Sequence, residues 1–221
     1  MSKTTLSARD SLRITEIFYS LQGETSRVGI PTVFIRLTGC PLRCHYCDTT
    51  YAFTGGNSMS RDEILREVAR YPSRNICVTG GEPLAQKGCI ALMQTLCDNG
   101  WSVSLETSGA IDVGAVDKRV AKVIDVKTPA SGEVEKNLWQ NFAHLNPYDE
   151  IKFVVCNEAD YLWTKSILQE HRLTEKCPVL LSPSQGQLEA RDLADWILRD
   201  GLQVRLQVQL HKLLWGNQQG K

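Results

Sequence analysis

The sequence lacks an excess of charge of either sign, and it lacks any long apolar run. Its 221 residues include 25 lysines and arginines against 25 aspartates and glutamates, so the formal net charge is zero. Because no basic run interleaved with aromatic residues is present, counterion release gives no basis for direct binding of nucleic acid. No stretch approaches the roughly 20 apolar residues of a membrane span. We therefore expect a small, soluble substrate, with neither nucleic acid nor a membrane as a partner.

The N-terminal region lacks an apolar stretch of the length found in signal peptides. Lys3, Arg9, Asp10 and Arg13 instead distribute charges through it. We therefore expect a cytoplasmic location, where the reducing environment leaves thiols available for metals. The chain also lacks internal repeats and linkers, and its hydrophobic content of 42% is enough for one substantial core. Length and composition thus predict a single domain, residues 1–221.

Three cysteines stand in one short loop, Cys40, Cys44 and Cys47, within the string C-P-L-R-C-H-Y-C. A tetrahedral zinc site needs four protein ligands, and the sequence has no second C-x-x-C and no H-x-x-x-H pair. Three thiolates on a 4Fe–4S cluster would leave one iron free for a ligand that is not protein. A zinc site completed by His45, by Asp48 or by a distant thiol stays open at this point. The other cysteines follow apolar patterns and are expected to fill the core: Cys77, Cys89, Cys97, Cys156 and Cys177.

Short β-branched runs alternate with amphipathic stretches along most of the chain. The runs are nearly continuous in apolar residues, as strands buried on both faces are. Their alternation with helical patterns predicts a parallel sheet with right-handed crossovers. The helices are too few for a full eight-fold barrel of about 250 residues, so we expect an α/β fold, a partial TIM-like barrel. The expected strands are 32–37, 75–79, 102–107, 121–126, 151–155, 178–182 and 205–210, and the expected helices are 62–70, 86–97, 161–170 and 188–199.

Polar motifs follow four of these expected strands. The cysteine loop follows the first, T-G-G-E-P the second, E-T-S-G the third, and D-V-K-T-P the fourth. Because the carboxyl ends of parallel strands share one edge of a sheet, ligands are expected to bind there. Gly80 and Gly81 would let the backbone approach a ligand, and the carboxylate of Glu106 and the hydroxyl of Ser108 would suit a ribose. Taken alone, these residues also suit a turn and a polar strand end.

The three-cysteine motif, with Gly-Gly-Glu-Pro after the next strand, resembles the radical S-adenosylmethionine superfamily. In that superfamily the open iron of a 4Fe–4S cluster binds S-adenosylmethionine, and electron transfer cleaves it to a 5′-deoxyadenosyl radical. Further segments are similar to the 7-carboxy-7-deazaguanine synthase family within it, from about Ile14 to Gly216. They are F-Y-S-L-Q-G-E at 18–24, the stretch from G-I-P-T to C-D-T at 29–49, V-T-G-G-E-P, L-E-T-S-G and a late L-H-K.

The resemblance implies an activity and its requirements. It implies a carbon–nitrogen lyase that converts 6-carboxy-5,6,7,8-tetrahydropterin into 7-carboxy-7-deazaguanine with release of ammonia, an early step towards queuosine and other 7-deazapurines. The implied cofactors are a 4Fe–4S cluster, S-adenosylmethionine and Mg²⁺. The implied partners are an electron donor such as a flavodoxin or ferredoxin, and a second copy of the chain in a homodimer.

The resemblance also implies roles for individual residues, while the chemical step itself is left to the radical. Residues 204–221 are expected to close the substrate side. The cluster would be held by Cys40, Cys44 and Cys47, and Mg²⁺ by Thr49. The cofactor would contact Tyr46, Cys47, Asp48, Gly81, Asp125, Val126 and Lys127, to which the ribose argument adds Glu106 and Ser108. The substrate would contact Leu21, Gln22, Gly23, Glu24, Arg36, Thr79, Ser182, Pro183, Ser184, Gln185 and His211.

Arg36 carries the substrate assignment on chemical grounds as well. An arginine inside a buried strand is costly unless it is paired, and its planar fork fits the carboxylate of the pterin. Without the family, a strand-end salt bridge would explain the residue equally well.

The sequence departs from the family pattern at three places. Thr25 stands where many members have glycine, which restricts φ in that loop. D-V-K-T-P replaces the S-P-K of some relatives, and the tail W-G-N-Q-Q-G-K extends past His211 further than in members whose terminal carboxylate touches substrate.

Two other classes of protein remain as alternatives. A glycyl-radical activase shares the three-cysteine motif but acts on a protein, and the L-Q-G-E and I-R-L-T-G-C segments argue against it. A zinc or electron-transfer module without enzymatic activity would need neither four ligand loops nor so long a chain.

Overall fold

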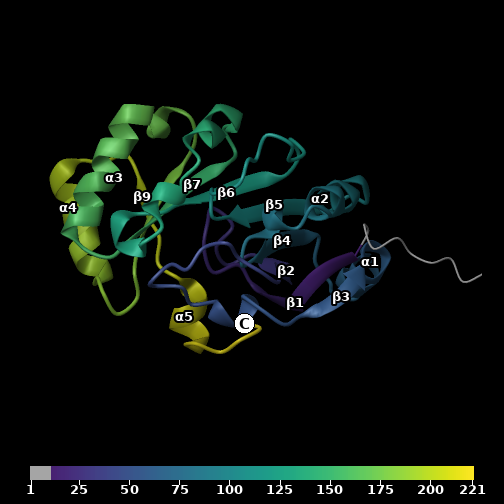
Figure 1. Ribbon diagram of the computed structural model, residues 1–221. Helices are drawn as coiled ribbons and strands as arrows, with labels where there is room; N and C mark the ends of the chain where they lie inside the picture. Colours follow the sequence, from purple (N-terminus) through teal and green to yellow (C-terminus); the bar gives the residue numbers. More distant parts are fainter. Residues whose placement is uncertain (1–10) are drawn as a thin grey trace, which may run out of the picture.

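The structure is a computed structural model that describes residues 11–221, which form one curved nine-stranded sheet with helices along its outer side (Figure 1). The charged residues Lys3, Arg9 and Asp10 lie outside the described residues. Among the residues described, no helix combines the length and apolar character needed to span a membrane. The strands are β1 (Ser11–Leu21), β2 (Pro31–Leu37), β3 (Asn57–Ser60), β4 (Asn75–Gly80), β5 (Ser102–Thr107), β6 (Ala121–Val126), β7 (Glu150–Val155), β8 (Val179–Pro183) and β9 (Arg205–Leu206).

The sheet is mostly parallel and does not close. Its strand order is β3-β1-β2-β4-β5-β6-β7-β8-β9, so β3 and β9 stand at opposite edges. From β2 to β9 each neighbouring pair is parallel, whereas β1 runs antiparallel to both β2 and β3. This arrangement confirms the predicted α/β fold with a partial barrel of parallel strands.

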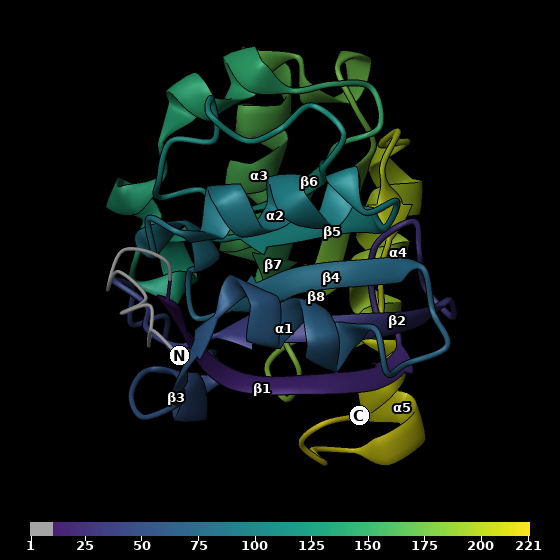
Figure 2. The ribbon, with the colours of Figure 1, turned by 90° about the vertical axis from the view of Figure 1, so that its right-hand side faces the viewer.

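The helices that connect parallel strands lie on the outer face, as crossover connections require. Figure 2 shows α1 and α2 side by side over one part of the sheet, while Figure 1 shows α3 and α4 outside the other part. The capping box of Ser60 and Glu63 explains why α1 begins where it does, since each side chain bonds the other's backbone N–H. The four predicted helices are confirmed to within three residues at each end. The helices are α1 (Arg61–Val68), α2 (Cys89–Asp98), α3 (Glu158–His171), α4 (Ala190–Asp200) and α5 (Leu210–Trp215), with short 3-10 helices η1 (Thr50–Ala52), η2 (Pro83–Ala85), η3 (Pro129–Ser131), η4 (Val134–Lys136), η5 (Trp139–His144) and η6 (Leu173–Glu175).

Alternation along the parallel strands separates the core from the site. Ile35 and Phe153 are fully buried in the hydrophobic core between sheet and helices. Their sequence neighbours Arg36 and Lys152 point to the opposite face and line a cavity inside the barrel. Because successive side chains in a strand face opposite sides, the same strands supply both the core and the polar groups of the site.

Strands β1 and β3 are additions to the predicted fold, and β1 contains a bulge that matters for the site. The pairing of β1 with β2 shifts register between Ile14 and Glu16. Leu12 and Ile14 pack in the core before the shift, and Ile17 packs against it after the shift. The extra residue, Thr15, therefore turns Glu16 to the inner face of the barrel, opposite its partner Arg36.

The strand expected at 205–210 is wrong beyond its first two residues. β9 pairs with β8 only through Arg205 and Leu206, and one further bond joins the Gln207 N–H to the Leu181 carbonyl. The partner strand then ends at Pro183, which has no N–H to donate. The chain leaves the sheet and begins α5 at Leu210.

Candidate active site

A cavity of 730 Å³ opens at the carboxyl edge of the parallel strands, a volume in the range of small-molecule sites. The four motif loops predicted to meet at this edge do so, because they follow β2, β4, β5 and β6. The structure brings together every residue assigned to a site from the sequence except Val126. The Val126 side chain packs outward in the core, so only its backbone is available to a ligand.

The cysteine loop forms one wall of the cavity, and its three thiols are free and half-buried. The loop is fixed by hydrogen bonds from the Gly39 N–H to the Ala52 carbonyl at 2.7 Å and from the Cys47 N–H to the Cys44 carbonyl at 3.1 Å. Burial raises the pKa of the Cys44 thiol to about 11, so a thiolate there needs a bound cation.

The three thiols can be compared with the donor sets of two kinds of metal site. Within residues 11–221, no three His, Cys, Asp or Glu side chains converge closely enough to hold one metal ion. A mononuclear zinc site requires such convergence, whereas a 4Fe–4S cluster takes one thiolate at each of three separate irons. The donor set of Cys40, Cys44 and Cys47 is three thiolates from one short loop, which is the set that three irons of a 4Fe–4S cluster take.

The Gly-Gly-Glu motif has a structural task that the sequence did not indicate. A Cβ at Gly81 would overlap the Gly39 carbonyl and meet the Cys40 Cβ at 2.8 Å, so the missing side chain makes room for the cysteine loop. Glu82 is fully buried, and its carboxylate accepts hydrogen bonds from the Thr107 hydroxyl at 2.9 Å and from the Ser108 N–H at 2.7 Å. The motif thus joins the loops after β2, β4 and β5.

The Ser108 hydroxyl also bonds to Glu82. Its assignment to a ribose remains a prediction, and that contact would compete with the bond to Glu82. Glu106, in contrast, points into the cavity, where it accepts hydrogen bonds from the Gln22 amide at 3.2 Å and the Thr79 hydroxyl at 3.0 Å.

Beside the cysteine loop, two buried polar atoms have no hydrogen-bond partner within the described residues. They are the Tyr46 hydroxyl and Asp125 Oδ1, and both residues line the cavity. Lys127 stands among them, with its Nζ 3.1 Å from Asp125 Oδ2 and 5.8 Å from the centre of the Tyr46 ring. Buried polar groups without partners are rare in folded proteins. This side of the cavity therefore fits a polar ligand such as a nucleoside, and we call it the cofactor side.

Arg36 also lines the cavity, where it is held in place by Glu16 and Tyr51. Arg36 Nε donates to Glu16 Oε1 at 2.7 Å, and the Tyr51 hydroxyl donates to the same oxygen at 2.8 Å. The guanidinium also lies 5.7 Å from the centre of the Phe18 ring and 5.8 Å from that of Tyr51. With Nε engaged, the two terminal nitrogens of the fork are the ones left to bind an anion in the cavity. We call this side, with β1 and residues 21–24, the substrate side.

Glu24 and Lys152 form a buried ion pair on the substrate side, and the Gln209 amide donates to the same carboxylate at 2.6 Å. Burial alone would raise the pKa of Glu24, but the Lys152 ammonium lowers it below its ordinary value. Burial alone would lower the pKa of Lys152, but Glu24, Asp125 and Glu106 raise it. Both groups are therefore charged.

Sequence reasoning missed Lys152 and Glu16 as residues of this region. The available signal for Lys152 was a lysine at the second position of the apolar run I-K-F-V-V. Glu16 gave no comparable signal, because its inward position depends on the bulge at Thr15.

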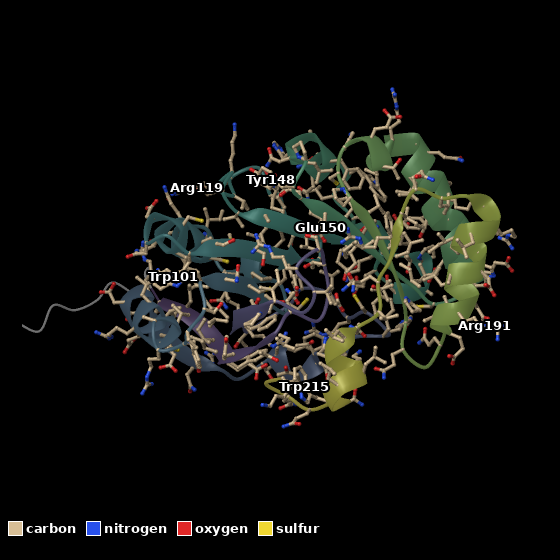
Figure 3. All side chains as sticks on the ribbon, turned by 180° about the vertical axis from the view of Figure 1, so that it is seen from behind. Trp101, Arg119, Tyr148, Glu150, Arg191 and Trp215 are labelled. Carbon is tan, nitrogen blue, oxygen red and sulfur yellow. The ribbon has the colours of Figure 1, made fainter. Side chains whose placement is uncertain are left out.

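The C-terminal segment covers the substrate side. The Leu210 N–H donates to the Gly23 carbonyl at 2.9 Å, and the His211 imidazole occupies the space that a Cβ at Gly23 would need. Lys212 Nζ lies 2.8 Å from Asp48 Oδ2, which ties α5 to the end of the cysteine loop. Residues 216–221 also line the cavity. Figure 3 labels Trp215 at the end of this helix, on the border of the molecule.

Two loop details complete the site. The Thr49 hydroxyl donates to Asp48 Oδ1 at 2.9 Å, which places two oxygen-bearing side chains together at the expected Mg²⁺ position.

Thr25, where the family pattern has glycine in many members, adopts φ +71° and accepts a hydrogen bond from the Arg27 N–H at 3.1 Å. The loop therefore takes the left-handed conformation that glycine adopts without strain.

Comparison with known proteins points in one direction. Residues 34–128 match the Radical SAM superfamily. The chain is 49% identical to the 7-carboxy-7-deazaguanine synthase of Chlorobaculum tepidum, across 95% of this chain and 97% of that protein. It is 43% identical to the 7-carboxy-7-deazaguanine synthase of Koribacter versatilis, across 92% and 97%. The crystal structure of QueE from Escherichia coli superposes with a TM-score of 0.77 at 26% identity, covering 91% of this chain and 95% of that one.

Proposed function

The chain belongs to the 7-carboxy-7-deazaguanine synthases of the radical S-adenosylmethionine superfamily, and we propose that its cavity carries out their reaction. The reaction converts 6-carboxy-5,6,7,8-tetrahydropterin into 7-carboxy-7-deazaguanine with release of ammonia, in the biosynthesis of queuosine and related 7-deazapurines. The observation that carries this proposal is that the cysteine loop and the Arg36 side chain line one and the same 730 Å³ cavity.

The cofactor side would hold the cluster and S-adenosylmethionine, which together supply one-electron chemistry when bound. Cys40, Cys44 and Cys47 would bind three irons. The unpartnered atoms of Tyr46 and Asp125 would accept or donate hydrogen bonds to the cofactor. The remaining assigned contacts are Cys47, Asp48, Gly81, Glu106, Ser108, Val126 and Lys127.

The substrate side would hold the pterin. Arg36 would bind the pterin carboxylate through its two terminal nitrogens, because Nε is already bonded to Glu16. That contact would orient the ring system towards the cofactor side, and it would exclude a pose in which the carboxylate is turned away from Arg36. The other assigned contacts are Leu21, Gln22, Gly23, Glu24, Thr79, Ser182, Pro183, Ser184, Gln185 and His211, with residues 204–221 closing this side over the bound pterin.

Further components follow from the same family assignment. Mg²⁺ would bind at Thr49, next to Asp48, since a hard cation takes oxygen ligands. A flavodoxin or ferredoxin would supply electrons, and two copies of the chain would form a homodimer. We further propose that residues 1–221 act as one radical SAM domain in the cytoplasm.

Anaerobic reconstitution tests the proposal. The protein is expected to take up about four irons and four sulfides, and to form the deazapurine acid from the pterin with S-adenosylmethionine and a reductant. Cys44→Ala should lose both the iron and the product. Cys97→Ala is the matched control, because Cys97 is also half-buried but lies on α2, outside the cavity. Uptake of zinc in place of iron, or loss of iron in Cys97→Ala alone, would contradict the assignment.

A further inference from the structure

The segment after β6, residues 128–133, contacts the cysteine loop at three points. The His45 N–H donates to the Ser131 carbonyl at 3.0 Å. His45 Nδ1 lies 3.2 Å from the Ala130 carbonyl oxygen, and the Arg43 N–H donates to the Glu133 carboxylate. Neither His45 nor Arg43 is a cluster ligand, yet both stand beside Cys44. We call residues 128–133 the cradle segment.

The cradle segment is itself fixed from the inside of the protein. Asp160 on α3 is almost fully buried, and its two carboxylate oxygens accept from the Ala130 N–H and the Cys156 N–H, each at 3.0 Å. The Thr128 hydroxyl donates to the Val154 carbonyl at 2.9 Å, and the fully buried Ser131 hydroxyl donates to the Thr128 carbonyl at 2.6 Å. The segment can therefore act as a rigid support.

Gly132 is the point at which this support meets the imidazole of His45. Its φ is +77°, and a Cβ there would lie 2.9 Å from both Cε1 and Nε2 of His45. The contact is with the far end of the exposed His45 ring, so a methyl group there would press on the ring and shift it away from the Ala130 carbonyl. The positive φ itself also favours glycine at this position.

We propose that the cradle segment and His45 position the cluster relative to the cofactor groups of β6. The segment begins directly after Asp125, Val126 and Lys127, so one rigid stretch of chain fixes both the proposed cofactor contacts and the loop with the proposed cluster ligands. His45 and Gly132 are positioning residues in this arrangement and touch no reacting atom. The inference rests on the proposed cluster site.

The test measures how fast iron leaves the reconstituted protein for a chelator under anaerobic conditions. Gly132→Ala places a methyl group against His45, and iron release should be about tenfold faster, the scale found for residues that support metal ligands. Gly100→Ala is the matched control, because Gly100 has φ +82° but a Cβ there meets nothing within 4 Å. It shares the backbone strain without the contact and should release iron at the wild-type rate.

Removal of the imidazole separates contact from strain. His45→Ala loses the bond to Ala130 and should release iron about threefold faster than wild type. The double variant His45→Ala/Gly132→Ala should match His45→Ala, because the methyl group then has nothing to displace. If Gly132→Ala does not fold, the rate of iron release from His45→Ala tests the proposal by itself, since the His45 side chain is exposed and outside the core.

The outcomes distinguish this inference from the function on which it rests. Any one of three results for the rate of iron release would overturn the cradle. Gly132→Ala could release iron no faster than Gly100→Ala, the double variant could release it as fast as Gly132→Ala, or His45→Ala could release it at the wild-type rate. A second readout is the change in the electron paramagnetic resonance spectrum of the reduced cluster on addition of S-adenosylmethionine, which should be smaller in Gly132→Ala than in Gly100→Ala. A wild-type protein that binds no iron would overturn the proposed function and the inference with it.

Discussion

On the cofactor side of the cavity, the hydroxyl of Tyr46 and one oxygen of Asp125 have no hydrogen-bond partner within residues 11–221. On the substrate side, the charged groups are already paired with one another. Arg36 is paired with Glu16, and Glu24 with Lys152. Both sides belong to one cavity and are formed by the same kind of strand end.

The difference teaches that the two sides bind their ligands in different ways. Polar atoms left without partners in a buried site pay a desolvation cost that a ligand can remove when it bonds to them. A closed network is instead preorganised, so its ligand loses less free energy in ordering the site. Substitutions on the substrate side should therefore cost stability, while those on the cofactor side should cost binding alone.

The largest effect is expected at the buried ion pair. Lys152→Met leaves the Glu24 carboxylate buried without its partner, and the free energy of unfolding should fall by about 3 to 5 kcal/mol. Chemical denaturation under reducing conditions measures this. Arg70→Met is the control, since Arg70 pairs with Glu67 on the surface and should matter by less than about 0.5 kcal/mol. A loss below about 1 kcal/mol in Lys152→Met would remove the distinction between the two sides.

The same pair predicts a dependence of stability on pH. Because the folded-state pKa of Glu24 is lowered, its contribution is fully present above its unfolded value of 4.5 and is lost as pH falls through the folded pKa. The unfolding free energy of the wild type should therefore decline below pH 4.5 more steeply than that of the double variant Glu24→Gln/Lys152→Met. Equal slopes in that acidic range would show that the pair contributes nothing.

A smaller effect is expected where the C-terminal segment meets the cysteine loop. Lys212→Met removes the ion pair with Asp48, which is about half exposed, so stability should change by about 1 kcal/mol or less. The proposed closing role of residues 204–221 predicts a weaker affinity for the pterin and an unchanged iron content. Lys165→Met, which breaks the Asp200 pair between α3 and α4, should leave pterin affinity alone. Equal pterin affinity in both variants would refute the closing role.

The smallest stability effect is expected on the cofactor side. Tyr46→Phe removes a buried hydroxyl that has no partner among the described residues, so stability should stay constant or rise by up to about 1 kcal/mol, while affinity for S-adenosylmethionine falls. Tyr161→Phe provides the contrast, because its hydroxyl donates to the Trp196 carbonyl at 2.8 Å and to Asp200 at 2.9 Å. That variant should lose about 1 to 2 kcal/mol. An equal loss of stability in Tyr46→Phe would mean that the Tyr46 hydroxyl does have a hydrogen-bond partner.

The parallel strands and their helices could be predicted because each carries its own local pattern. Continuous apolar runs identified β2 and β4 to β8, and helical periodicity identified α1 to α4. β1 could not be found in the same way, since the bulge at Thr15 shifts its alternation from Leu12 and Ile14 to Ile17. β9 ended early because the end of its partner strand, and not its own composition, limits the pairing.

The site could be predicted as a set of loops but not as a network of contacts. Almost every residue assigned from the sequence lines the cavity, because the motif loops follow strands whose carboxyl ends lie at one edge. The ion-pair partners came only from the structure. Glu24 and Lys152 are 128 residues apart, and Glu16 meets Arg36 only through the antiparallel register of β1. Such contacts depend on tertiary packing, which a local pattern does not encode.

Anaerobic calorimetric titration of S-adenosylmethionine, and of the pterin in its presence, into reconstituted Arg36→Lys and Asp125→Asn tests the two-sided cavity most directly. Lysine keeps the charge of Arg36 but loses its planar fork, so pterin affinity should weaken by about 1 to 3 kcal/mol while affinity for S-adenosylmethionine stays at the wild-type value. Asp125→Asn should show the reverse. If either variant weakened both ligands equally with its iron content intact, the two sides would not bind separate molecules, and the assignment of Arg36 to the substrate would be wrong.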